Sequence, residues 1–150
     1  MTQDLDPDDM LARFVAAQAD SYPTALAELR RGRKQSHWMW FVFPQIAGLG
    51  RSPTAQFYAI RDAKEAHAYL NHPILGPRLH EAVAAAIAAN GSAEAIFGAV
   101  DAMKLRSSLS LFAAVADDPV PFRAGLDRFF GGQDDPATRA RLDRTAPDGR

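Results

Sequence analysis

The sequence has no cysteine, and this absence excludes disulfide bonds and thiolate metal ligands from the 150-residue chain. It also has no apolar stretch that approaches the roughly 20 residues needed to span a membrane as a helix. The first ten residues, MTQDLDPDDM, have neither a basic start nor an apolar run, so we expect no secretory signal peptide. We therefore expect a cytoplasmic protein with no membrane partner.

A strong excess of either charge is also missing. The chain has 17 Lys and Arg against 18 Asp and Glu residues, and its net charge of −1 creates no global field that favours nucleic acid. Local charge is uneven, with a basic cluster at residues 30–34 and several arginines after residue 138. We interpret the C-terminal charges as solvated surface, so nucleic acid is not an expected partner. The oligomeric state stays open.

Alanine is abundant, and most prolines lie where a helix would begin. Both features favour an all-α fold. A chain of this length suits one domain, which buries roughly 70% of the surface that the unfolded chain exposes. We predict a compact single-domain bundle of about seven to eight short helices over residues 1–150. Residues 1–5 and 144–150 are expected to be frayed.

Caps and breakers place the individual helices. Asp6-Pro7 starts a first helix that should stop near Asp20, and Ser21-Tyr22-Pro23 starts a second that ends at Gly32. Further helix starts are predicted at Ser52-Pro53, Asp62, Gly76-Pro77, Ser92, Asp101, Asp118-Pro119 and Asp135-Pro136. Further stops are predicted near Leu70, Ala89, Gly98, Gly131 and Leu142.

The most unusual stretch is residues 32–52, GRKQSHWMWFVFPQIAGLGRS. Within it, Ser36 can cap a short helix that runs to Phe43 and that Pro44 closes. The aromatic and β-branched residues are also compatible with a buried strand. We favour the helix because nothing nearby offers a clear strand partner.

Aromatic side chains in and after this stretch are candidate walls of a binding site. Trp38, Trp40 and Tyr58 offer flat faces on which a base or a sugar can stack. The alternative is that Trp38, Phe41 and Val42 belong to the core. Two tryptophans around one methionine leave two indole N–H groups in need of partners, which argues against a role in packing alone.

Polar side chains in the same stretch are candidates for ligand contact and catalysis. Arg33 and Lys34 can contact a phosphate or carboxylate. His37 can move a proton near neutral pH, and Gln45 can orient a ligand or assist that transfer. The alternatives are that Arg33 and Lys34 cover the edge of the core with their aliphatic stems, and that His37 is a buried structural residue.

Two further segments carry candidate cations. Residues 48–53 combine glycines, Arg51 and a capped helix start, an arrangement that can hold an anion but that is more often a simple connection. Arg106 lies beside Ser107 and Ser108, which would be weak nucleophiles without a base. The serines are also compatible with close helix packing.

The histidines do not form a recognisable metal motif. His67 lies in one predicted helix, His72 in a turn and His80 in another helix, and no HExxH pattern is present. Most of the acidic residues lie at helix starts, where capping explains them. We therefore expect no metal ion and no cofactor.

Several motifs carry a family resemblance. The stretch GRKQSHWMWFVFPQIAGLGRSPTAQFYAI resembles the hallmark of the family known as domain of unknown function 1810. The stretches EAHAYLNHPILGPRL, MKLRSSLSLF and FFGGQDDPATRARL are similar to the same pattern, and together they cover about residues 14–142. The resemblance implies a compact multihelical fold and no established activity. Members are often labelled calpastatin, but calpain-inhibitor repeats are disordered and carry a TIPPxYR-type signature, and this sequence has neither feature.

The candidate residues together predict a site for an anionic, nucleotide-like small molecule. If the protein is an enzyme, we expect hydrolysis or group transfer on a nucleotide-like glycosidic or phosphate compound, although the sequence identifies neither a nucleophile nor a general base. The competing hypothesis is a non-catalytic protein–protein interaction module with a purely structural aromatic segment. The site hypothesis requires His37, Gln45 and at least one arginine to converge on a concave pocket.

Overall fold

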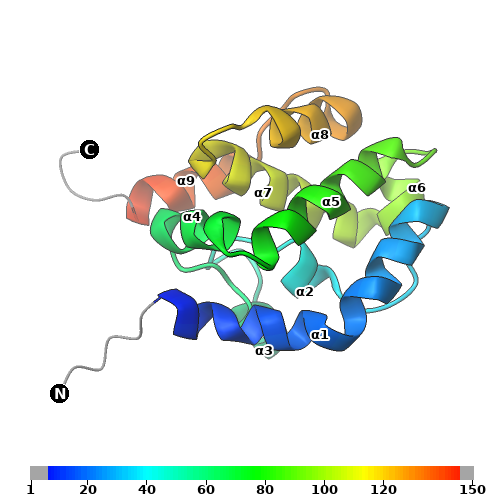
Figure 1. The fold of residues 1–150 in the computed structure, drawn as a ribbon. Coiled ribbons are helices and arrows are strands. Elements are labelled where there is room, and N and C mark those ends of the chain that lie inside the picture. The colour runs from blue at the N-terminus through cyan, green and yellow to red at the C-terminus, as the bar shows by residue number, and fades with distance from the viewer. Residues whose placement is uncertain (1–6, 146–150) are drawn as a thin grey trace, which may run out of the picture.

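The structure is a computed structural model that describes residues 7–145, with side chains described for residues 10–144. Its regular elements in that range are nine α-helices (Figure 1). They are α1 (Pro7–Arg31), α2 (Met39–Val42), α3 (Pro53–Phe57), α4 (Ala63–Asn71), α5 (Leu75–Ala88), α6 (Ala93–Phe97), α7 (Ala99–Val115), α8 (Val120–Phe130) and α9 (Pro136–Thr145). The predicted all-α fold is confirmed. The cap Asp6 and nearly all of the residues expected to fray lie outside the described residues.

The first helix is longer than the sequence indicates. We predicted a stop near Asp20 and a new start at Pro23, but α1 continues through Pro23 to Arg31, bending on the way (Figure 1). Proline inside a helix costs about 3 kcal/mol because it removes one hydrogen bond and clashes with the preceding turn. Here Tyr22 and Leu29 are buried on the same apolar stripe as the first half of the helix, and this burial outweighs that cost.

Several predicted caps are confirmed. The side-chain oxygens of Ser52 and Ser92 accept hydrogen bonds from Ala55 N and Ala95 N, at the starts of α3 and α6. Asp62 accepts one from Glu65 N at the start of α4. Local capping chemistry therefore decides where these helices begin.

The helix expected in the tryptophan stretch is confirmed but is much shorter than predicted. Only Met39–Val42 are helical, and Trp38 rather than Ser36 occupies the N-cap position. The Ser36 hydroxyl instead contacts Glu28 of α1. The strand alternative for residues 36–43 is wrong, and the isolated parallel bridge between Ile46 and Ile60 lies after that segment.

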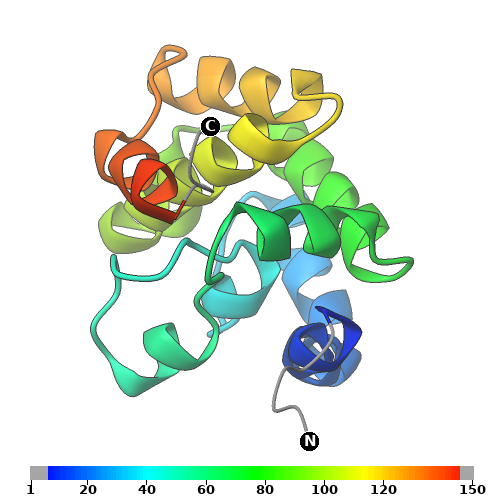
Figure 2. The same cartoon turned by 90° about the vertical axis from the view of Figure 1, so that its left-hand side faces the viewer.

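The helices enclose one continuous core. Figures 1 and 2 both place α8 at one end of the molecule and α1 and α3 at the opposite end, with α4, α5 and α7 between them. Helix α7 packs against α4, α6, α8 and α9, and α1 packs against α2 and α5. Within the described range, none of the helices is long and apolar enough to cross a membrane.

Candidate functional site

The loop after α1 is organised by a single buried carboxylate. Glu28 is only 2% exposed, and its Oε1 accepts hydrogen bonds from the backbone N–H groups of Gln35 (2.7 Å) and Ser36 (2.9 Å). The same oxygen accepts the indole N–H of Trp38 at 2.9 Å, while Oε2 accepts the Ser36 hydroxyl at 2.5 Å. Glu28 thereby ties the tryptophan stretch to the end of α1.

The environment of Glu28 keeps its side chain ionised. Burial alone would raise the pKa of this carboxyl, but hydrogen bonds from Ser36, Gln35 and Trp38 outweigh burial and lower the pKa to about 2. A group with so low a pKa is a permanent acceptor near neutral pH rather than a proton donor. Because Trp38 is only 1% exposed and its indole N–H is paired with Glu28, this residue belongs to the core and does not line a binding site.

Next along the loop, two lysines share one aspartate. Lys34 Nζ lies 2.9 Å from Asp101 Oδ2, and Lys104 Nζ lies 3.5 Å from Asp101 Oδ1. The Lys34 ammonium also donates to the Ser36 carbonyl at 2.5 Å and is nearly buried. Lys104 sits 5.2 Å from the centre of the Trp40 ring, a cation–π distance. Lys34 is therefore fully engaged, whereas Lys104 holds its aspartate only loosely.

A pocket of about 340 Å³ opens beside Lys104. Its walls come from the 45–50 loop, from the first half of α7 and from the segment that starts α9. The lining residues are Gln45, Leu49, Gly50, Val100, Met103, Lys104, Arg106, Ser107, Asp135 and Ala137. Most of this surface is apolar with a few polar groups, which is the usual composition of a small-molecule site.

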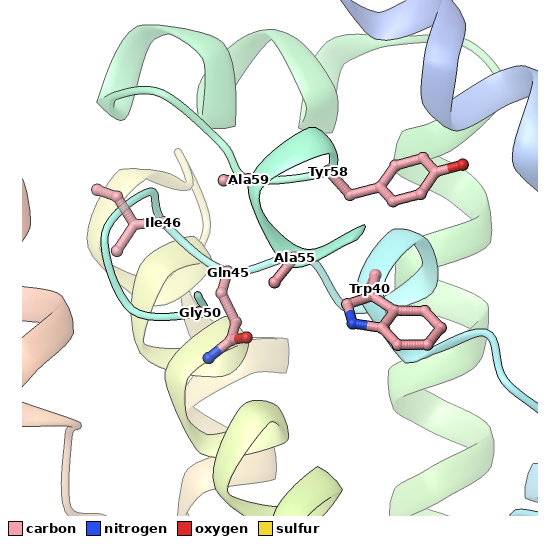
Figure 3. A pocket seen from close by; sticks show the side chains of 7 residues that line it. All are labelled: Trp40, Gln45, Ile46, Gly50, Ala55, Tyr58 and Ala59. Atoms are coloured by element: carbon pink, nitrogen blue, oxygen red, sulfur yellow. The ribbon is translucent and has the colours of Figure 1, made fainter. Parts of the chain in front are cut away.

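A small crevice lies next to this pocket and shares Gln45 and Gly50 with it. Trp40 and Tyr58 contribute its aromatic surface (Figure 3). Its volume of about 10 Å³ holds roughly one water molecule. The crevice alone is too small for a ligand, but it places the Trp40 indole beside two residues that also line the larger pocket.

The side chains at the α9 end of the pocket have structural partners. Arg106 donates to the carbonyl groups of Gln133 (3.1 Å) and Asp134 (2.7 Å). Ser107 donates to Asp135 Oδ2 at 2.9 Å, and the same carboxylate oxygen accepts the backbone N–H of Thr138 at the start of α9. Ser107 and Arg106 therefore fasten the segment before α9 to α7.

A third cation approaches the 45–50 loop from α9. Gly48 has φ +101°, and a Cβ atom there would lie 2.6 Å from Cζ of Arg141 and 2.7 Å from its Nη1. The guanidinium therefore occupies the space that any side chain at position 48 would fill. A glycine is needed at this position for its backbone conformation and for this close approach.

The structure brings only some of the predicted site residues together. Gln45 and Arg106 line the pocket, and Trp40 and Tyr58 line the adjoining crevice. Lys34 and Trp38 are engaged by Asp101 and Glu28, respectively. The exposed residues Arg33, His37 and Arg51 line neither cavity.

Ser108 and the histidines line neither cavity, and His67, His72 and His80 lie where the sequence predicts, in α4, in the turn that follows and in α5, respectively. The Ser108 hydroxyl is buried and has no hydrogen-bond partner among the described residues. His72 Nδ1 accepts the backbone N–H of Ile74 at 3.1 Å, so this ring helps to start α5. No cluster of three or more metal-ligating side chains occurs in the described part of the chain.

Comparison with known proteins gives a match over nearly the whole length. The family described as "Protein of unknown function (DUF1810)" matches residues 8–142. The chain belongs to this family. Among solved structures, the chain is similar to the conserved hypothetical protein Rv1873 from Mycobacterium tuberculosis, with 50% identity and a TM-score of 0.88. The similarity covers 92% of this chain and 99% of that one, while no curated protein matches.

The motifs that identify this family coincide with structural networks. The tryptophan stretch is held by Glu28, which our sequence interpretation missed. The KLRSS stretch holds the segment before α9, and Asp135 caps α9. A glutamate on the apolar stripe of α1, next to Leu29, was the available sequence signal for Glu28, because an acid on a buried face needs donors. For Lys104 the signal was the three- and four-residue spacing of Asp101, Lys104 and Ser108, which predicts one polar helix face that could line a cleft, whereas Met103 gave no comparable signal.

Proposed function

We propose that this protein binds a small anionic molecule of the nucleotide-like class in the pocket between the 45–50 loop, α7 and α9. One observation carries the proposal: Gln45 and Arg106, predicted separately from the sequence, line the same cavity of about 340 Å³. That volume lies within the range of small-molecule sites. The proposal places this binding in the cytoplasm, as the sequence indicates.

Charge at the pocket favours an anionic ligand. Lys104 and Arg106 both line it, and the Arg141 guanidinium lies against Gly48 of the same loop. The nearby carboxylates are occupied, because Asp101 pairs with two lysines and Asp135 accepts hydrogen bonds from α7 and α9. Because Lys104 shares Asp101 with Lys34, a phosphate or carboxylate group on the ligand would give Lys104 an anionic partner of its own.

The geometry supports binding more strongly than catalysis. His37, the predicted proton-transfer residue, lies outside both cavities, so the convergence of His37, Gln45 and an arginine that the sequence hypothesis required is not met, and only Gln45 and Arg106 share a cavity. Among the described residues that line the pocket, Asp135 is the acid, and its Oδ2 is already shared by the Ser107 hydroxyl and two groups of Thr138. Hydrolysis or group transfer would need a base that this lining does not offer.

A thermal-shift screen with nucleotides, ADP-ribose, NAD and sugar phosphates tests the proposal. A bound ligand at one hundred times its Kd stabilises the native state by about 2.7 kcal/mol, which raises the Tm of a domain of this size by roughly 5 °C or more. Lys104→Ala should abolish most of this rise. Arg51→Ala and His37→Ala should leave it unchanged, because neither residue reaches the pocket. Absence of any shift at millimolar concentrations, or an undiminished shift in Lys104→Ala, would overturn the proposal.

A second candidate function is a protein-binding module. Val100 and Met103 line the pocket and are 67% and 72% exposed, which is high for large apolar side chains. The screen distinguishes the two candidates. An interaction module gives no Tm shift with any of these compounds, whereas a small-molecule site gives one that depends on Lys104.

A further inference from the structure

The buried polar side chains near the tryptophan stretch have partners. Gln18 is a clear example, since its Nε2 donates to the Phe41 carbonyl at 2.7 Å and to the Tyr69 hydroxyl at 3.0 Å. Its Oε1 accepts from Arg78 Nη1 at 3.5 Å. This amide is satisfied on both sides and fastens α2 to α1, as expected of a glutamine in a core.

The half-buried side-chain amide of Gln45, unlike that of Gln18, is not hydrogen-bonded to any of the described residues. The Trp40 indole N–H is in the same state, although the Trp38 indole N–H is paired with Glu28. Neither Gln45 nor Trp40 has a fully buried unpaired atom, so these groups are open to molecules that enter the cavities.

The fold holds the Gln45 backbone while leaving its amide free. The Gln45 carbonyl accepts Ile60 N at 2.8 Å, and Ala47 N donates to the Ile60 carbonyl at 2.7 Å. Pro44, directly before Gln45, is buried. Figure 3 shows the Gln45 amide and the nitrogen-bearing edge of the Trp40 indole beside the crevice that both residues line. A fixed backbone that presents an unpaired amide to a cavity is typical of a recognition residue.

Lys104 lies within reach of the same region. It lines the larger pocket with Gln45, and its ammonium group lies 5.2 Å from the centre of the Trp40 ring. Because Asp101 is already bound to Lys34 at 2.9 Å, its 3.5 Å contact with Lys104 leaves that ammonium the more open to an anion. A cation and an unpaired amide are thus presented to one cavity.

We propose that Gln45 is the specificity-determining residue of this pocket and reads a planar, amide-like edge of the ligand, while Lys104 binds the ligand's anionic group. A glutamine amide presents a donor beside an acceptor, and its complement is a group with an adjacent acceptor and donor, such as a carboxamide, a lactam or a nucleobase edge. The Trp40 N–H adds a donor for a carbonyl. This inference rests on the proposed function and specifies the ligand's chemistry.

Isothermal titration of the full chain with AMP, GMP, CMP and UMP, compared with ribose 5-phosphate, tests the inference. All five carry the same phosphate, but only the nucleotides carry a planar base. For the unmodified protein, at least one nucleotide should bind about tenfold or more tightly than ribose 5-phosphate, since losing a good donor–acceptor pair costs about that factor. Gln45→Leu should reduce this ratio to less than about threefold while leaving the affinity for ribose 5-phosphate unchanged.

Two further variants sharpen the result. Gln45→Glu keeps the shape of the side chain but lacks the N–H donor, so it should lose the same preference. Gln35→Leu changes an exposed glutamine that lines neither cavity and should keep the preference. Equal binding of nucleotides and ribose 5-phosphate, or a preference that persists in both Gln45 variants, overturns the inference while the pocket proposal stands. Absence of binding by all five compounds overturns both.

Discussion

Single side chains decide where the tryptophan stretch lies. Glu28 accepts four hydrogen bonds from residues 35–38, and these bonds set the path of the chain between α1 and α2. Trp38 is fixed by this carboxylate, whereas Trp40, two residues later, faces the crevice with its N–H unpaired among the described residues. The two indoles that look alike in the sequence therefore have opposite roles, one in the core and one at a cavity.

Replacing Glu28 should destabilise the protein strongly. In Glu28→Ala, several donors become buried without an acceptor, and we expect a loss of about 3 kcal/mol or more in the free energy of unfolding. Urea denaturation followed by circular dichroism measures this loss. Glu94→Ala, an exposed glutamate in the first turn of α6, should change the same quantity by about 1 kcal/mol or less. Equal effects of the two substitutions would contradict the role of Glu28.

The low pKa of Glu28 also predicts a pH dependence. The pKa of this carboxyl is about 2 in the folded protein and about 4.3 in an unfolded chain. The ionised side chain therefore stabilises the fold when the pH is above the pKa of the unfolded chain. This contribution, about 2–3 kcal/mol at neutral pH, is lost as the pH falls from about 5 toward 2. Urea unfolding at pH 7, 5, 4 and 3 should show a smaller acid-dependent loss in Glu28→Gln than in the unmodified protein. Parallel curves for the two proteins would be inconsistent with this assignment.

Among the elements, α7 is the one that joins the core to the candidate site. Its inner side packs against α4, α6 and α8, while Met103, Lys104 and Ser107 line the pocket. Helix α9 completes the pocket, and hydrogen bonds of Asp135 and Arg106 help to fasten its start to α7. The shape of the pocket thus depends on the contact between these two helices.

Loss of the α9 cap should loosen this helix before the rest of the fold. Asp135 Oδ2 accepts hydrogen bonds from Ser107 Oγ, Thr138 N and Thr138 Oγ1, so Asp135→Ala should cost about 2 kcal/mol. Hydrogen exchange followed by mass spectrometry should show faster exchange in residues 136–145, with α1 and α5 nearly unchanged. Asp143→Ala, at the exposed end of α9, is the matched control. Uniformly faster exchange over all helices would argue against a local role.

For the whole molecule, the sequence correctly predicted the features that depend on neighbouring residues, such as the starts of capped helices. Caps at Ser52, Asp62 and Ser92 place helix starts correctly because each bond joins residues three apart. The continuity of α1 through Pro23 could not be predicted in this way, since it depends on burial against other helices. The pocket could not be predicted from local sequence either, because its walls come from three segments that are distant in the sequence.

For the candidate residues too, the sequence predicts the chemical type of a side chain but not where the fold places it. Gln45 and Arg106 were predicted from their chemical types, but their shared cavity depends on how the 45–50 loop meets α7. The His37 side chain could take part in catalysis, but it lies at the surface and away from the pocket lining. It lies there because Glu28 holds the residues on either side, Ser36 and Trp38. Residue type alone cannot separate these cases. Burial and hydrogen-bond partners separate them.

The two tryptophans allow a test of where a ligand binds. In a ¹⁵N-labelled protein, the indole N–H groups of Trp38 and Trp40 give separate signals, and only the second faces a cavity. Titration with whichever of AMP, GMP, CMP and UMP binds most tightly should shift the Trp40 indole and Gln45 side-chain signals, together with backbone signals of residues 100–107, and leave the Trp38 indole signal in place. No shifts, or shifts confined to a region away from Gln45 and α7, would contradict a binding site in this pocket.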